Sequence, residues 1–400
     1  MNYQGSRFTL ELQILLEAVK LCLLNSPKDR FAILINSKEV NWQKLNEMVI
    51  YHRIRPLFYE ACRLVDFKNK EVKVFEKFSR RQAIKNLVIS EELGRVLLLL
   101  QENGIEVIPY KGILFIEKLY KNKILRESSD IDILVKPRNA LKAIKLLIQE
   151  GYAISTTHAE ITSVDDHVLT ELIERTQIQE LSLLKDLPSG INVHIDFHWA
   201  VGETFHQYTL GVDELFEEAN VETFQRRQLL IPNTKTIFKM MLNHHGGRGC
   251  WIRLKDFSDM LAFKNQHPEL EFATLQTWAA EMKMSRIFAI GNAIMQGIFL
   301  DSEPHQQIEP KLQKHIFDYW ETSKEYDHFW SKYNHRNIYR QLQDTPMSWL
   351  ALSHQLVKYY AIPNEMEKKR LVVFPDRYVY LNAFTKLVSY AWFRAREKNT

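Results

Sequence analysis

Apolar residues recur with a helical period through the first hundred residues. Over residues 8–24 they lie three and four positions apart, with charged residues on the opposite face, which predicts an amphipathic helix. Asn41 is a good N-cap for another helix, which Pro56 is expected to end or restart. A further helix is predicted over residues 70–103, with an Asn-Gly pair at its C-terminal end.

The period shortens over residues 104–202, where strands and helices alternate. Short β-branched runs predict strands at 105–110 and 129–135, and an amphipathic helix follows at 140–150. Turn-forming residues at 186–190 separate two alternating runs and predict a hairpin.

Helical spacing returns from about residue 212. Helices are predicted at 234–245, 252–265, 272–300, 308–331, 335–361 and 378–397. The pattern therefore predicts an α+β protein with an N-terminal helical region at 1–103, a small α/β core at 104–211 and a C-terminal helical domain at 212–400.

The composition is that of an ordinary globular protein with several domains. The 400 residues carry a formal net charge of only +4, which does not by itself indicate a nucleic-acid partner. The three cysteines are widely spaced, and none lies in a C-x-x-C pair, which favours a reducing compartment and argues against structural zinc. We find no signal peptide and no apolar run long enough to span a membrane, so the sequence predicts a soluble, cytoplasmic protein.

Two carboxylates lie on one face of the predicted strand at 129–135. Asp130 and Asp132 alternate with Ile131, Ile133 and Val135, which form the apolar face. Unpaired anions about 6–7 Å apart repel each other, and a divalent cation such as Mg²⁺ between them would remove the repulsion. An exposed edge strand with solvated aspartates is the alternative, because D-x-D alone is a weak signal.

The second hairpin strand carries three more polar residues on one face. His194, Asp196 and His198 alternate with apolar neighbours. If this strand lies beside the first, Asp196 joins Asp130 and Asp132 in a site for two divalent metals, which suits in-line phosphoryl displacement. The histidines could support such a site from behind, or they could be ordinary polar residues on a half-exposed strand.

Candidate phosphate-binding residues lie just upstream of the aspartates. Lys111 and Gly112 occupy a strand-to-helix turn, where backbone N–H groups and the helix dipole favour anions. Arg126 could fork onto phosphate oxygens, and Ser128 and Ser129 add hydroxyl groups. Solvated loop charge is the alternative for the two cations.

A Gly-rich segment lies at residues 244–249, beyond the predicted core. It could be a flexible basic loop over the nucleotide, with Arg248, Arg253 and Lys255 near phosphates, or its glycines could only cap the preceding helix. The last helix mixes aromatic residues with arginines, which is typical of a domain core and also occurs at membrane or partner surfaces.

These motifs, taken together, resemble a group of bacterial nucleotidyltransferases with a K-G…Y…R…D-I-D-x-L-V pattern, within the DNA polymerase β-like superfamily. The matching residues are Lys111, Gly112, Tyr120, Arg126 and Asp130 to Val135, followed by Asp196-Phe-His198-Trp199; Trp42 with His52 to Pro56 and Arg253-Leu-Lys-Asp256 resemble its helical elements. The wider superfamily places Gly-Ser just before its D-x-D, whereas here Lys111-Gly112 lies farther upstream.

The resemblance implies a mixed-sheet nucleotidyltransferase core that uses Mg²⁺, or Mn²⁺, and a nucleoside triphosphate such as ATP. Asp130 and Asp132 would hold the metals, and Asp196 would complete the site and act on the acceptor. Lys111, Gly112, Arg126, Ser128, Ser129 and Arg253 would bind the nucleotide.

The predicted reaction is transfer of a nucleotidyl group to an acceptor with release of pyrophosphate. A small molecule, peptide, sugar phosphate or protein could be the acceptor, and nucleic acid is less favoured. Two alternatives remain: a metal-dependent D-x-D glycosyltransferase that uses a nucleotide sugar, and a non-catalytic module that senses nucleotides or binds a partner.

Overall fold

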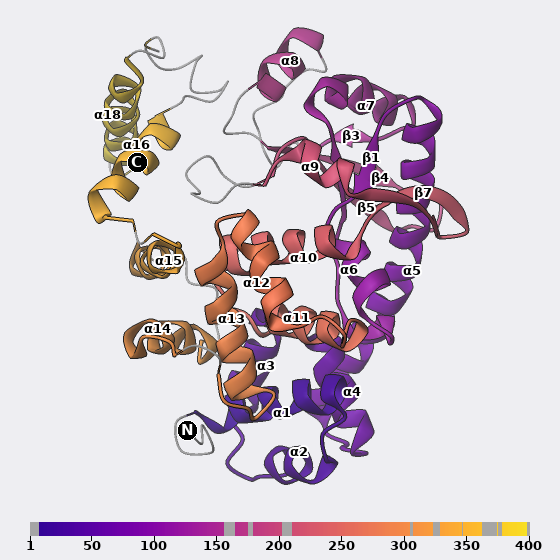
Figure 1. Cartoon of the computed structure of the whole chain (residues 1–400), viewed down its shortest axis with the longest axis vertical. Coiled ribbons are helices and arrows are strands. Elements are labelled where there is room, and N and C mark those ends of the chain that lie inside the picture. The colour runs from indigo at the N-terminus through magenta and orange to yellow at the C-terminus, as the bar shows by residue number, and fades with distance from the viewer. Residues whose placement is uncertain are drawn as a thin grey trace.

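A computed structural model of the chain describes residues 8–155, 165–174, 179–201, 210–304, 307–322, 329–345, 347–361, 374 and 378–397. Its N-terminal helices lie at one end of the long axis and the main sheet lies toward the other, with further helices between and beside them (Figure 1). The architecture is α+β, as predicted.

The N-terminal region is helical. Its helices are α1 (Leu10–Leu24), α2 (Lys28–Ile35), α3 (Trp42–Tyr51), α4 (Arg55–Leu64) and the long α5 (Lys73–Glu102), which a short 3-10 turn precedes at Lys70–Val72. The predicted caps are confirmed: the Asn41 side chain accepts a hydrogen bond from Lys44 N (3.0 Å), and Gly104 has a φ of +70° after α5. Pro56 lies in the first turn of α4, so it restarts the helix.

The core contains one five-stranded mixed sheet in the order β1-β2-β5-β4-β3. The strands are β1 (Val107–Pro109), β2 (Ile131–Val135), β3 (Ala153–Ile154), β4 (Glu180–Asp186) and β5 (Asn192–His198). The central pair, β2 and β5, is parallel, and the other neighbours are antiparallel. Helices α5, α6 (Gly112–Leu119) and α7 (Pro137–Gln149) contact β2 and bury its apolar side chains.

A second hairpin was missed in the region predicted to be helical. Strands β6 (Ala219–Phe224) and β7 (Arg227–Pro232) pair with each other, and β7 packs against α5 and β1. Gln225 and Arg226 form the connecting turn with φ angles of 49° and 61°. Asn or Gly normally occupies such positions, so neither residue indicates a hairpin turn here.

The remaining helices surround the core. They are α8 (Asp166–Glu174), α9 (Val212–Glu217), α10 (Thr234–Leu242), α11 (Leu254–Gln266), α12 (Phe272–Glu281), α13 (Ser285–Ile298), α14 (Pro310–Trp320), α15 (Phe329–Leu342), α16 (Trp349–Ala361) and α18 (Val379–Glu397), with a 3-10 turn at Lys123–Leu125. Two predicted helices are each divided in two: residues 272–300 form α12 and α13, and residues 335–361 contribute to α15 and α16. Residues 323–328 of the predicted helix at 308–331 lie outside the described part of the chain.

The N-terminal and C-terminal helices pack directly on each other. Helix α1 contacts α11, and Thr9 N donates a hydrogen bond to Glu321 Oε1 just after α14 (2.9 Å). Trp251 and Trp320 are fully buried in this part of the core. No helix in the described ranges is long and apolar enough to cross a membrane.

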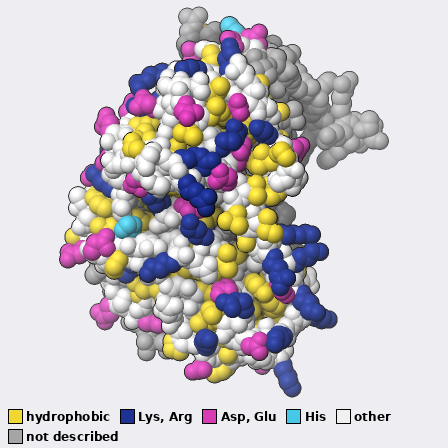
Figure 2. Space-filling model, turned by 90° about the vertical axis from the view of Figure 1, so that its right-hand side faces the viewer, with side chains coloured by type: hydrophobic (Ala, Val, Ile, Leu, Met, Phe, Trp, Pro, Cys, Tyr) yellow, Lys and Arg dark blue, Asp and Glu magenta, His cyan; other side chains and the backbone are white. Residues whose placement is uncertain are grey.

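The face of the molecule that includes α5 has mixed charge. Lys and Arg side chains are interspersed with acidic and hydrophobic ones over this face (Figure 2). This mixture agrees with a sequence of 53 basic and 49 acidic residues.

Candidate active site

The sheet brings the predicted carboxylates together at the mouth of one cleft. Asp132 on β2 lies directly opposite Asp196 on the parallel strand β5, and Asp130 precedes β2. A cleft of about 860 Å³ lies between this edge of the sheet and the helices of the N- and C-terminal regions. Of the predicted site residues, those that line it are Lys111, Gly112, Arg126, Ser128, Ser129, Asp130, Asp132, Asp196 and Arg253.

Asp132 is an ionised, enclosed carboxylate. Its side chain is almost buried, with 8% of the residue exposed. His198 Nε2 lies 3.2 Å and Lys111 Nζ lies 3.5 Å from Asp132 Oδ1. Burial would raise the pKa of Asp132, but Lys111 and His198 outweigh burial and lower that pKa below its ordinary value.

The pKa of Asp196 is shifted in the opposite direction from that of Asp132. Its Oδ1 accepts a hydrogen bond from Ser182 Oγ (2.8 Å), and it has no cationic partner among the described residues. Burial, followed by the negative charges of Asp132 and Asp130, raises the pKa of Asp196 to about 6. A divalent cation among these carboxylates would relieve their repulsion, and oxygen ligands suit Mg²⁺.

The carboxylates are not gathered in liganding positions. Within the described ranges, no group of three His, Cys, Asp or Glu side chains is close enough to hold a metal ion as it stands. Each aspartate instead contacts a neighbour, and Asp130 Oδ2 accepts from Ser129 Oγ (2.9 Å). The donor chemistry fits Mg²⁺, but the side chains would have to rotate toward the ion.

The two histidines of β5 have different environments. His198 is buried behind Asp132, and its Nδ1 lies 3.0 Å from Glu180 Oε2. Burial would raise the pKa of Glu180, but His198 lowers it to about 2. His194 is exposed and does not line the cleft, so the structure brings only His198 to the site.

Glu180 was missed in the sequence. It lines the cleft and pairs directly with His198 across the β4–β5 hairpin. Counting cross-strand partners outward from the turn at 186–190 would have placed Glu180 opposite His198.

The Lys111-Gly112 turn approaches Asp132 closely. Lys111 has a φ of 58°, which is unfavourable for a residue with a side chain, and Gly112 has a φ of +34°. A Cβ atom on Gly112 would lie 2.7 Å from Asp132 Oδ2 and 3.3 Å from Ser128 Oγ. Glycine is therefore required for the start of α6 to lie against the carboxylates.

The loop before β2 is held by side chains of α5. Gln82 Nε2 donates to Ser128 O (2.5 Å), and Asn86 Nδ2 donates to Arg126 O (3.0 Å). These polar side chains on an otherwise amphipathic helix fix the backbone that leads into Asp130.

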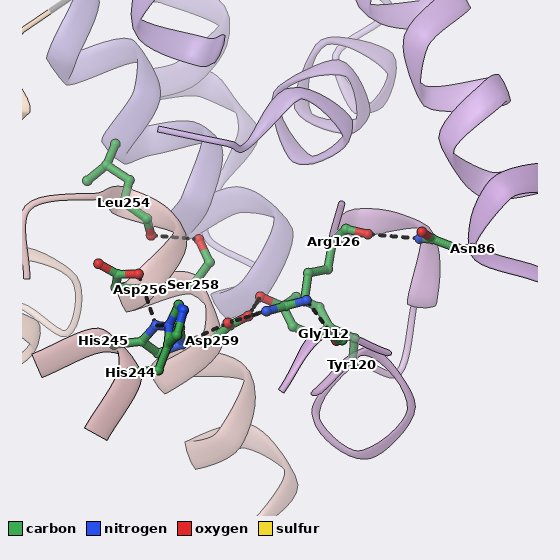
Figure 3. Close-up of polar contacts among 10 residues, drawn as sticks. All are labelled: Asn86, Gly112, Tyr120, Arg126, His244, His245, Leu254, Asp256, Ser258 and Asp259. Carbon is green, nitrogen blue, oxygen red and sulfur yellow. Dashed lines mark hydrogen bonds and ion pairs between the residues drawn. The ribbon is translucent and has the colours of Figure 1, made fainter. Parts of the chain in front are cut away.

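Arg126 is held in a buried polar network (Figure 3). Its Nε and one terminal nitrogen lie 2.8 and 3.0 Å from the two carboxylate oxygens of Asp259, and its other terminal nitrogen donates to Gly112 O (2.9 Å). Tyr120 Oη also donates to Asp259 Oδ1 (2.7 Å). Arg126 therefore ties α11 to the Lys111-Gly112 turn, a role that the sequence did not indicate.

His245 extends this network toward the start of α11. Its Nε2 lies 2.9 Å from Asp259 Oδ2 and its Nδ1 lies 3.0 Å from Asp256 Oδ1 (Figure 3). Burial would lower the pKa of His245, but the two carboxylates outweigh it and raise that pKa. Burial would raise the pKa of Asp259, but Arg126 and His245 hold it well below its usual range.

The segment 244–249 is therefore not the flexible loop considered above, nor a simple helix cap. Asn243–Arg248 form a π-helical turn that continues α10. A Cβ on Gly246 would lie 2.3 Å from Ile287 Cγ2 and 2.7 Å from Trp251 Cζ2. The glycine allows tight packing, and the extra residue of the π turn directs the histidines inward.

Five further basic residues line the cleft and form what we call its basic wall. Arg53, Arg55, Arg248, Arg253 and Lys255 all line the cleft. Arg55 pairs with the buried Glu127 (2.7 Å), and the Arg253 guanidinium lies 5.6 Å from the centre of the Tyr51 ring. Arg53 and Arg55 were not predicted as site residues; the segment His52 to Pro56 was only likened to a helical element of the family.

Comparison with protein families identifies the family of the chain. The family model described as uncharacterised nucleotidyltransferase matches residues 38–299, more than half of the chain. That span includes the sheet, the carboxylates and the basic wall up to Lys255. No curated protein matches the chain.

Proposed function

The chain belongs to the uncharacterised nucleotidyltransferase family, and we propose that it transfers a nucleotidyl group from a nucleoside triphosphate to an acceptor in a Mg²⁺-dependent reaction. The observation that carries this proposal is the pairing of Asp132 with Asp196 across two parallel strands, beside Asp130 and in the same cleft as the basic wall. Carboxylates and cations that line one cleft suit a metal-bound triphosphate.

Asp130, Asp132 and Asp196 would hold Mg²⁺, with Mn²⁺ as a substitute of similar chemistry. When bound, the metal would supply positive charge that polarises phosphate oxygens. The buried His198 would then keep Asp132 oriented, because its other ring nitrogen is held by Glu180.

The triphosphate would bind where α6 begins. Gly112 lets phosphate oxygens approach the backbone, and the helix N-terminus and the Lys111 ammonium favour their charge. Ser128 and Ser129 line the same part of the cleft. Arg126 would act as a positioning residue, because its guanidinium is already bound to Asp259 and Gly112 O.

The acceptor oxygen would form a bond to the α-phosphorus as the bond between the α-phosphorus and the α–β bridging oxygen breaks, and pyrophosphate would leave. Asp196 is placed beside Asp130 and Asp132 and would orient the acceptor and take its proton. Arg248 and Arg253, which line the cleft, would stabilise the charge of the departing pyrophosphate.

The test uses α-labelled nucleoside triphosphates, Mg²⁺ and a panel of acceptors, with label transfer and pyrophosphate release as readouts. Asp130→Asn combined with Asp132→Asn is expected to abolish both. Asp66→Asn is a matched control, because Asp66 is exposed and does not line the cleft. Label transfer that survives the double substitution would overturn the proposal.

A further inference from the structure

Two helices begin at the wall of the cleft. The start of α6 carries Lys111 and Gly112 beside the carboxylates. The start of α11, a helix of 13 residues, carries Lys255 in its first turn. Helix N-termini favour anions, so the cleft has two separate places with this preference.

His52 holds Arg53 beside the start of α11. Leu254 N donates to His52 Nδ1 (3.2 Å), and His52 Nε2 donates to Trp320 O (3.0 Å). Burial lowers the pKa of His52 to about 4, so the ring is neutral and one nitrogen accepts while the other donates. Because Arg53 follows His52 directly, this bond holds the Arg53 turn against α11.

Arg53 occupies a backbone position that favours glycine. It has a φ of 53° and follows α3, with Arg53 N bonded to Ile50 O (3.0 Å) and Ile54 N bonded to Val49 O (3.3 Å). This is a Schellman ending, in which the left-handed residue is usually Gly. An arginine is less favourable there than a glycine, and the exposed Arg53 lines the cleft.

Lys255 lies partly buried in the same place without an ion pair to any described residue. Burial and the charges of Arg126 and Arg53 lower the pKa of Lys255 to about 8, although the carboxylates of Asp259 and Asp256 oppose that shift. Both carboxylates already form ion pairs, Asp259 with Arg126 and Asp256 with His245. The half-buried Lys255 and the exposed Arg53 are thus like charges that line one cleft and repel each other, and a bound anion would stabilise them.

We propose that Arg53, Lys255 and the start of α11 form a second anion subsite, which binds the phosphate group of a small phosphorylated acceptor. A guanidinium and an ammonium at a helix N-terminus match the several oxygens of a phosphate monoester. The assignment to an acceptor rests on the nucleotidyl transfer proposed above. A cleft of about 860 Å³ has room for a small acceptor beside a nucleotide.

The experiment measures two affinities by isothermal titration calorimetry on the full chain with Mg²⁺. The first ligand is the α,β-methylene analogue of whichever of ATP, GTP, CTP or UTP binds most tightly. The second is glycerol 3-phosphate, titrated into the protein saturated with that analogue, with glycerol as the uncharged control. Arg53→Gly and Lys255→Gln test the subsite, and Lys264→Gln on the exposed end of α11 is the matched control.

Glycerol 3-phosphate is expected to bind the saturated protein, and glycerol is not. Each test substitution should weaken that binding by about tenfold or more, the effect of losing one charge-assisted hydrogen bond, and change the affinity for the analogue far less. Arg53→Gly should keep or raise the melting temperature, so lost binding will not reflect unfolding.

Competition between the two ligands, no binding of glycerol 3-phosphate to the parent protein, or unchanged binding in both variants would each overturn the subsite. If no nucleotide analogue binds, the proposed function fails, and titration of glycerol 3-phosphate into the free protein still decides the subsite by the same comparison of variants.

Discussion

Replacing Asp196 with Asn tests whether the site carboxylates repel one another when no cation is present. Asp196 lies opposite Asp132 and near Asp130, and burial together with these charges raises its pKa to about 6. An Asn side chain has the same shape and can still accept from Ser182, but it carries no charge. We therefore expect the metal-free variant to be more stable than the parent protein.

The magnitude follows from the pKa of Asp196. An aspartate in an unfolded chain has a pKa of about 3.9, so a folded-state pKa of about 6 is a rise of about 2 units, equivalent to at most about 3 kcal/mol. Solvent access to the partly exposed side chain reduces this figure, and we expect about 1–2 kcal/mol.

The direction of the Asp196 pKa shift determines the pH range in which the substitution stabilises the protein. Because the folded state binds this proton more tightly than the unfolded state, ionisation of Asp196 favours unfolding. The destabilisation is absent below about pH 4, develops between about pH 4 and 6, and is complete above about pH 6. The variant should gain stability at about pH 7.5 and gain none near pH 4.

The assay is thermal unfolding in a chelator at several pH values, followed by addition of Mg²⁺. Mg²⁺ should raise the melting temperature of the parent protein more than that of the variant, because it relieves a repulsion that the variant lacks. Asp66→Asn serves again as the control. A variant that is no more stable than the parent at about pH 7.5, or a gain that does not depend on pH, would refute the reasoning.

Three further substitutions test the packing around the site. Gly112→Ala would place a Cβ 2.7 Å from Asp132 Oδ2; it should lower stability by about 1–3 kcal/mol and abolish nucleotide binding by calorimetry, and normal binding would contradict the close approach. Asp259→Asn leaves buried Arg126 without its carboxylate and should cost about 3–5 kcal/mol at neutral pH; because the pKa of Asp259 is depressed, its contribution is lost in acid, so the difference from the parent should shrink as the pH falls below about 4. Gly246→Ala would place a Cβ 2.3 Å from a side chain of α13 and should lower the melting temperature, and an unchanged value would refute the tight packing.

The placement of the three aspartates follows from local patterns. A strand alternates its side chains with a period of two, so the sequence placed Asp130 and Asp132 on one face of their strand and Asp196 on one face of another. That the two strands are neighbours, with Asp132 paired to Asp196, needed the structure, because register depends on how the strands meet.

Other parts of the site depend on contacts that no local pattern records. Arg126 and Asp259 are 133 positions apart, so nothing near Arg126 in the chain reveals that its guanidinium is already engaged. Gly246 suggested a loop, whereas close packing against Trp251 is what requires a glycine there. The hairpin turn at Gln225 was missed because its residues adopt left-handed angles without the usual Asn or Gly.

Helix α11 carries Lys255 in its first turn and Asp259 one turn later. Lys255 belongs to the proposed acceptor subsite. Asp259 binds Arg126, which in turn donates to Gly112 O and so supports the Lys111-Gly112 turn. A rigid helix that moves at one end also moves at the other. A shift of α11 on acceptor binding would therefore alter the Lys111-Gly112 turn, where the triphosphate is proposed to bind. Thermodynamic linkage then requires that each ligand change the affinity for the other by the same factor. Helix α11 would thus couple the binding of the acceptor to the binding of the nucleotide.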